Sequence, residues 1–79
     1  MMQRYEQTRR VYRVRVTYAR GRNIEEGQES NVYRVRIGYY PSGSKYEYLV
    51  WSRELGKCVW VREDDVLVLA VSLAPIHTF

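Results

Sequence analysis

Residues 11–16, VYRVRV, return almost unchanged as residues 32–37, VYRVRI. Both copies alternate apolar and basic residues with period two, which is the pattern of a β-strand whose side chains point to opposite faces in turn. Each predicted strand therefore has an apolar face and an arginine face. A sheet that contains both strands would carry arginines on one side, and this basic side is the main functional clue in the sequence.

The sequence predicts five strands and no helix. The two copies lie in strands of about 9–18 and 32–39, and two more strands cover 45–51 and 57–62. The last strand begins with the apolar run 66–71 and is ended by Ala74 and Pro75. Recurring valines favour a strand for this run, and its near-continuous apolar character is typical of a strand covered on both faces. Residues 19–31 are glycine- and glutamate-rich and predict a long exposed loop. We interpret Gly38, Gly43 and Gly56 as turn glycines.

The order of strands, long loop, tight hairpin and short acidic turn is similar to that of the small SH3-like barrel. Residues 48–51, 56–61 and 63–66 resemble its third strand, distal hairpin, fourth strand and turn into the fifth. The acidic and aromatic signature of SH3 domains that bind proline-rich peptides is missing from the first loop, so that activity does not carry over. The predicted fold is all-β, either a small five-stranded SH3-like barrel or a strongly bent antiparallel sheet. An OB-type barrel and an open sheet that pairs in a dimer are alternatives.

With 79 residues the chain is the size of one small domain. We expect a flexible segment at 1–8, a barrel-like domain at 9–74 and a tail at 75–79. A core of this size leaves little room for a deep substrate cavity. The length therefore favours binding at the surface over buried chemistry.

The alternation also predicts a register between strands. If Arg36 lies opposite Glu47, apolar residues of the second and third strands face one another as well. A hairpin loop at 53–56 sets Glu47 opposite Arg62 in the same way. The predicted core is then Tyr33, Val35, Ile37, Tyr48, Val50, Val59 and Val61. Four further side chains fall on the arginine side: Leu49, Trp51, Cys58 and Trp60.

The chain has 13 Lys and Arg against 9 Asp and Glu, for a net charge of +4. A basic excess favours anionic partners. Arginine and tyrosine with interspersed glutamate are also typical of heat-adapted proteins, in which ion-pair networks contribute more to stability. An alternative to an anionic partner is therefore that Glu47 and the loop residues Glu25, Glu26 and Glu29 neutralise the arginines in a solvated network.

We predict sequence-tolerant binding of nucleic acid, duplex DNA in particular. Guanidinium groups contact phosphates, and exposed indoles stack on bases or wedge into a groove. The inferred surface resembles in kind the three-stranded sheet of small archaeal chromatin proteins with SH3-like barrels, although those are lysine-dominated. The predicted binding residues are Arg13, Arg15, Arg34, Arg36, Trp51, Trp60 and Arg62.

The sequence lacks the patterns of catalytic and metal sites. A single cysteine, Cys58, forms no internal disulfide and indicates a reducing, cytoplasmic compartment. With one histidine, His77, there is no Cys and His cluster for a metal. The longest apolar run, 66–74, is too short for a membrane helix. We therefore predict no enzyme, no cofactor, no membrane partner and no small-molecule substrate.

An alternative function is that of a protein-interaction module without a role in nucleic-acid binding. Residues 66–73, or exposed tryptophans, could form an apolar contact with another protein or a second copy. The chain would then be a homo-oligomeric protein-interaction module, with a homodimer as the simplest form, or an accessory protein of a mobile element of hot-environment archaea. Neither of these has a nucleic-acid role.

Overall fold

The computed structural model describes residues 8–75 and forms a five-stranded antiparallel sheet with strand order β4-β3-β2-β1-β5. The strands are β1 (Thr8–Val16), β2 (Glu29–Tyr40), β3 (Gly43–Ser52), β4 (Lys57–Arg62) and β5 (Val66–Pro75). Two 3₁₀ turns are η1 (Arg20–Arg22) and η2 (Glu63–Asp65). The predicted all-β class is confirmed. Of its two predicted forms the structure has the strongly bent sheet, because β4 and β5 remain edges and the sheet does not close into a barrel.

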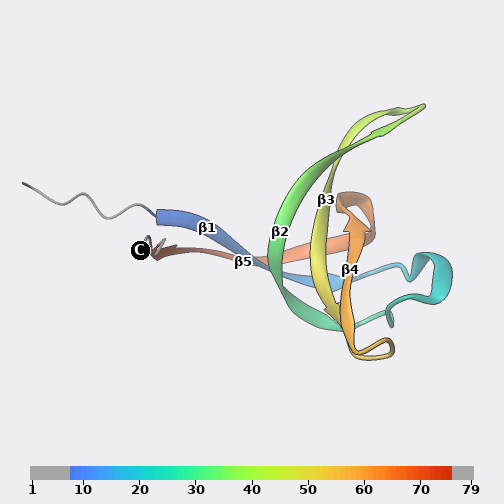
Figure 1. The fold of residues 1–79 in the computed structure, drawn as a ribbon, viewed down its shortest axis with the longest axis horizontal. Coiled ribbons are helices and arrows are strands. Elements are labelled where there is room, and N and C mark those ends of the chain that lie inside the picture. Colours follow the sequence, from blue (N-terminus) through green and yellow to red (C-terminus); the bar gives the residue numbers. More distant parts are fainter. Residues whose placement is uncertain (1–7, 76–79) are drawn as a thin grey trace, which may run out of the picture.

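The sheet consists of two parts that share β2. Figure 1 shows β1 and β5 as a two-stranded ribbon that extends away from β2, β3 and β4, while β2 and β3 curve together. The radius of gyration is 14.9 Å, whereas a compact chain of this length has about 12 Å. The molecule is therefore elongated, and the ribbon is largely uncovered.

The strand bounds agree closely with the prediction except in β2. This strand begins at Glu29 instead of residue 32, and its first residues form the ladder to β1, in which Arg13 lies opposite Asn31 and Arg15 opposite Glu29. The predicted flexible segment 1–8 and tail 75–79 lie outside the described residues, apart from Thr8 and Pro75, which begin β1 and end β5.

The tight turn between β2 and β3 is formed by Pro41 and Ser42, because Tyr40 and Gly43 are already cross-strand partners. Gly43 has a φ of 122°, a conformation that glycine adopts without steric cost. Gly38 lies within β2, so its prediction as a turn glycine was wrong.

The core lies on the inner, concave face of the sheet. Its buried side chains are Val14, Val16, Ile24, Val32, Tyr48, Val50 and Val61. The predictions for Tyr48, Val50 and Val61 are confirmed, and Val59 packs against the core. The loop before β2 was predicted to be exposed, but its Ile24 joins the core. Its Gln28 is buried as well and donates from Nε2 to the Trp51 carbonyl oxygen at 2.6 Å.

The predicted burial of Tyr33, Val35 and Ile37 was wrong, since these side chains are 45–52% exposed. A bulge between Val32 and Arg34 places Val32 opposite Val50, the position predicted for Tyr33. A bulge adds one residue to one strand and so changes which side chain faces inward. Val35 and Ile37 do lie opposite Tyr48 and Tyr46, as the alternation predicts. They are exposed because few other side chains pack over this part of the β2–β3 hairpin.

The prediction that the run 66–71 is covered on both faces was also wrong. β5 is an edge strand that pairs only with β1. Its large side chains from Leu67 to Leu73 are exposed by 36–68%. Within the described residues this apolar run is therefore largely uncovered, which is unusual for a soluble surface.

The loop after β1 is fixed to η2 by an ion pair. Arg20 donates from Nε and Nη2 to the two carboxylate oxygens of Asp65, each at 2.9 Å. The Asp65 carboxylate is almost fully buried, and the Asp65 carbonyl oxygen accepts the main-chain N–H groups of Thr17 and Tyr18. These contacts hold the loop beside the end of β4.

Candidate nucleic-acid interface

The outer, convex face of β2, β3 and β4 brings together five of the seven predicted binding residues. We call it the arginine–tryptophan face; it consists of Arg34, Arg36, Trp51, Trp60 and Arg62. Directly opposed residues of neighbouring strands share a face. One row is therefore Arg36, Glu47 and Arg62, the next is Arg34, Leu49 and Trp60, and Trp51 lies opposite Cys58. The predicted pairs of Arg36 with Glu47 and of Glu47 with Arg62 are confirmed.

Two of these arginines stack on aromatic rings. The Arg36 Cζ lies 3.9 Å from the Trp60 ring centroid, and the Arg62 Cζ lies 4.1 Å from that of Tyr40. Cation–π contacts of this kind hold a guanidinium flat against its ring. The N–H groups in the guanidinium plane stay available to a carboxylate or a phosphate at its edge.

Glu47 lies between the stacked arginines. It accepts a hydrogen bond from Arg36 Nε at 2.8 Å and another from the Tyr40 hydroxyl. The Tyr40 hydroxyl, and after it Arg36, lowers the pKa of Glu47, while Glu47 raises the pKa of Tyr40. A Cβ at Gly38 would lie 2.8 Å from Glu47 Cδ, so the glycine leaves room for this carboxylate. Glu47 is therefore ionised at neutral pH and offsets one positive charge.

Arg13 and Arg15 form a separate group on β1. Arg15 Nη2 lies 3.4 Å from Glu29 Oε2, Arg13 Nε lies 3.8 Å from Glu29 Oε1, and Arg13 Nη1 donates to Asn31 Oδ1 at 3.0 Å. Their register with Glu29 and Asn31 puts them on the outer side of the sheet. They lie opposite the first residues of β2, ahead of the bulge that precedes Arg34. That they adjoin Arg34 and Arg36 stays a prediction.

The face keeps a positive balance. Of the four glutamates that the sequence offered as counter-charges, Glu29 and Glu47 make ion pairs with these arginines, and within residues 8–75 Glu25 and Glu26 do not. Among the ion pairs of the same residues, Arg34 and Arg62 have no carboxylate within 4.0 Å. Unpaired arginines on an exposed face favour an external anion.

The two indoles differ in what they offer to a ligand. Trp60 is half-buried, and one side of its ring is covered by Arg36. Trp51 is 42% exposed, and no cation–π contact of the described residues involves it. Trp51 is therefore the indole with a face open to a stacking partner.

A cavity of about 170 Å³ opens at one end of the face. It is lined on one side by Tyr40, Glu47, Trp60 and Arg62 and on the other by the loop residues Tyr18 and Arg20. The sequence prediction missed Tyr40, although the alternation that selects Arg34 and Arg36 reaches it two positions beyond Gly38. It also missed the loop residues, which come to this edge through the Arg20–Asp65 ion pair.

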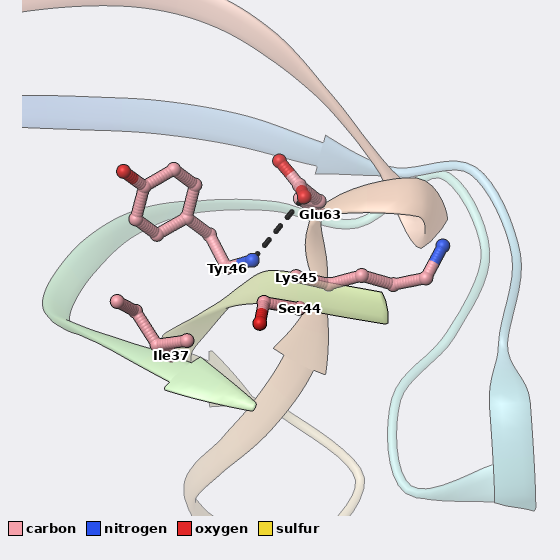
Figure 2. A pocket seen from close by; sticks show the side chains of 5 residues that line it. All are labelled: Ile37, Ser44, Lys45, Tyr46 and Glu63. Carbon is pink, nitrogen blue, oxygen red and sulfur yellow. Dashed lines mark hydrogen bonds between the residues drawn. The ribbon is translucent and has the colours of Figure 1, made fainter. Parts of the chain in front are cut away.

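A second, shallow pocket of about 210 Å³ lies between the β2–β3 hairpin and η2 (Figure 2). Ile37, Ser44, Lys45, Tyr46 and Glu63 line it. The Tyr46 main-chain N–H donates to Glu63 Oε1 at 3.2 Å, and Lys45 pairs with Asp64. The polar groups here tie the hairpin to the 3₁₀ turn, so we interpret this pocket as structural.

Two further findings concern residues 8–75 only. No group of three or more His, Cys, Asp or Glu side chains is placed to hold a metal ion. His77, the single histidine of the sequence, lies outside these residues. Within the same range no helix is both long and apolar enough to cross a membrane. Comparisons with known protein families, curated proteins and solved structures find no match to this chain.

Removal of the Tyr40 hydroxyl should raise the pKa of Glu47. Because the pKa of Glu47 is lower in the folded chain, its ionised form stabilises the fold above the unfolded pKa of about 4.3. This stabilisation is lost as the pH falls through the folded pKa, and in Tyr40→Phe the loss should begin at a higher pH. An NMR titration of the Glu47 carboxyl carbon measures the shift. Tyr39→Phe, at an exposed ring, is the control, and equal titration of both variants would contradict the assignment.

Proposed function

We propose that the chain binds duplex DNA with little sequence preference through the arginine–tryptophan face. The observation that carries the proposal is the juxtaposition of Arg34, Arg36 and Arg62 with two indoles in adjacent rows of an exposed face, with one internal carboxylate among them. Arg13 and Arg15 would add phosphate contacts along the ribbon, reduced by their pairing with Glu29.

The shape of the face supports a duplex as the ligand. The face is convex, whereas proteins that bind single strands without sequence preference use a positively charged groove. Arg36 and Arg62 lie on β2 and β4, two strand spacings or about 10 Å apart. The major groove of B-DNA is about 12 Å wide and admits a two-stranded ribbon. The spacing of Arg36 and Arg62 is therefore close to the separation of the two phosphate walls of this groove, which the arginines could contact from outside it.

The stacking of the arginines supports low sequence preference. Arg36 Cζ and Arg62 Cζ lie 3.9 and 4.1 Å from aromatic ring centroids, so these guanidinium groups are held against side chains of their own sheet. Donors held in this way are placed to contact backbone phosphates instead of extending toward base edges. Phosphate contacts position a protein on DNA but carry no sequence information.

Titration of the whole chain with a labelled duplex at several salt concentrations tests this proposal. Neutralisation of about four to six phosphates gives a slope of log K against log salt of roughly −4 to −5. AT-rich and GC-rich duplexes should bind within a few-fold of each other. A chain that leaves the duplex free at about 50 mM salt, or that prefers single strands, would contradict the proposal.

Trp51→Ala should weaken duplex binding about 10-fold, or about 1.4 kcal/mol, because it removes the apolar ring that would wedge against a base step of the duplex. The slope against salt should not change, since no charge is removed. Leu55→Ala, at an exposed apolar residue of the β3–β4 turn, is the control. Fluorescence anisotropy measures both affinities, and equal affinity of the two variants would show that Trp51 does not touch the ligand.

The remaining properties of the proposal follow from the sequence. We propose a non-enzymatic, cofactor-free role in the cytoplasm, with nucleic acid instead of a membrane or small molecule as the partner. Cys58 is a free, exposed thiol, which suits a reducing compartment. A heat-adapted archaeal source stays a prediction, supported by the arginine ion pairs.

A further inference from the structure

The uncovered edge of β5 is the largest feature that DNA binding leaves unexplained. The strand has ten residues, Val66–Pro75, and none of them is charged. Leu67 lies on the outer face opposite Arg15, and Val68 and Val71 lie on the inner face opposite Val14 and Tyr12. All three are exposed. The edge is therefore apolar on both faces, and no other strand of residues 8–75 pairs with its free main-chain groups.

The opposite edge of the sheet shows the contrast. β4 has six residues, and charged side chains stand at its two ends, Lys57 and Arg62. Natural sheets protect exposed edges with short strands, charges, proline or bulges, because a long apolar edge pairs with other chains. β5 has one bulge beside Leu69 and a proline only at its end. The sequence thus protects one edge and leaves the other open.

We propose that β5 pairs with β5 of a second copy of this chain, antiparallel about a two-fold axis. An antiparallel pair of identical strands is self-complementary, since residue i of one copy meets residue j of the other and j meets i. Because opposed residues share a face, the axis passes through a pair of identical residues, and with nearly full overlap of the strands this pair is Val71 and its symmetry mate. The product is a continuous ten-stranded sheet with the order β4-β3-β2-β1-β5-β5-β1-β2-β3-β4.

The charge distribution favours a second copy as the occupant. β1, the inner neighbour of β5, carries Arg9, Arg10, Arg13 and Arg15, and these arginine rows of two like-charged copies would repel each other at short distance. Pairing through β5 puts two uncharged strands between the β1 strands, which are then three spacings or about 14 Å apart. This exceeds the Debye length of about 8 Å at physiological salt. The neutral strand therefore separates the arginine rows of the two copies.

The size of the contact indicates a dissociable dimer. Ten residues at about 3.3 Å each give an edge about 33 Å long, along which main-chain hydrogen bonds supply affinity as in other strand additions. A contact along one strand edge buries less surface than a standard interface, which buries roughly 800 Å² per partner. We therefore expect dissociation in the micromolar range. A two-fold axis perpendicular to the sheet turns both arginine–tryptophan faces to the same side, and their joint use of one duplex rests on the proposed function.

Sedimentation of the full chain without nucleic acid, from about 1 to 500 µM, tests the dimer. We expect the mass to rise from 9.5 kDa to twice that value, with tighter association at 500 than at 50 mM salt because the copies carry like charge. Duplex binding has the opposite salt dependence. The two proposals can therefore fail independently.

Val71→Lys should remain a monomer throughout this range, a loss of association of at least 100-fold, because it sets two lysines beside the two-fold axis. Leu73→Glu is a second disrupting variant, should Val71→Lys fail to fold by circular dichroism. Leu55→Lys is the control at similar exposure away from β5, and it should dimerise like wild type. A wild-type chain that is monomeric at 500 µM overturns the proposal. So does a dimer that persists in the β5 variants.

Discussion

The double variant Arg34→Ala/Arg62→Ala should bind duplex DNA about 30-fold more weakly than wild type. These arginines have no ion pair among the described residues, so their charge is available to phosphate. Each arginine–phosphate pair at an exposed site contributes about 1 kcal/mol of binding free energy. Loss of two such pairs raises the Kd roughly 30-fold. The slope of log K against log salt should become shallower by about 1.8, or about 0.9 for each phosphate that the variant no longer neutralises.

Arg13→Ala/Arg15→Ala is a control that removes the same charge. Both arginines already pair with Glu29, so their replacement also releases a carboxylate, and we expect only about a 3-fold loss of affinity. The two variants are compared by anisotropy at equal salt. Equal losses would show that net charge governs binding and that the arginine–tryptophan face has no special part in it.

Val32→Asp should strongly destabilise the chain. Val32 is buried in the core opposite Val50, and an unpaired carboxylate there costs about 3–5 kcal/mol. The total stability of 79 residues is about 4–12 kcal/mol, so the variant should lose from about a quarter to nearly all of it and unfold at the lower end of that range. Far-UV circular dichroism during urea unfolding measures the change.

Tyr33→Asp is the matched control at the adjacent position. The Tyr33 side chain is half exposed because of the bulge, and we expect a change within about 1 kcal/mol. The two variants introduce the same residue into the same strand. If Tyr33→Asp unfolds the chain and Val32→Asp does not, the register of β2 is the unbulged one and the core assignment is wrong.

Alternation and charge pairing were sufficient to predict most of the sheet. The register of β2 with β3 was predicted from Arg36 and Glu47, because this alignment puts acid opposite base and apolar residues together, and the hairpin that sets Glu47 opposite Arg62 agrees with it. The bulge could not be predicted in this way. Val32 and Tyr33 are both apolar, so the pattern of residue types does not say which of them faces the core.

The candidate site could be predicted where its residues alternate along neighbouring strands and so fall on the same face of the sheet. Arg34, Arg36, Trp60 and Arg62 came from pairings that the structure has. Arg13 and Arg15 were placed beside them on the condition that the first strand pairs with the second. In the structure β1 does pair with β2, but through the residues that precede the second copy. Long-range placement of this kind, like that of Arg20 by Asp65, depends on tertiary contacts that local pattern does not encode.

The most direct test of the proposed interface is an NMR titration with a short duplex that follows the side-chain Nε–H signals of arginine and the two indole N–H signals. We expect the signals of Arg34, Arg36 and Arg62 and of both tryptophans to shift together, with smaller changes at Arg13 and Arg15. Changes confined to the ribbon of β1 and β5, or no change at about 50 mM salt, would contradict the assignment of the arginine–tryptophan face as the DNA-binding surface.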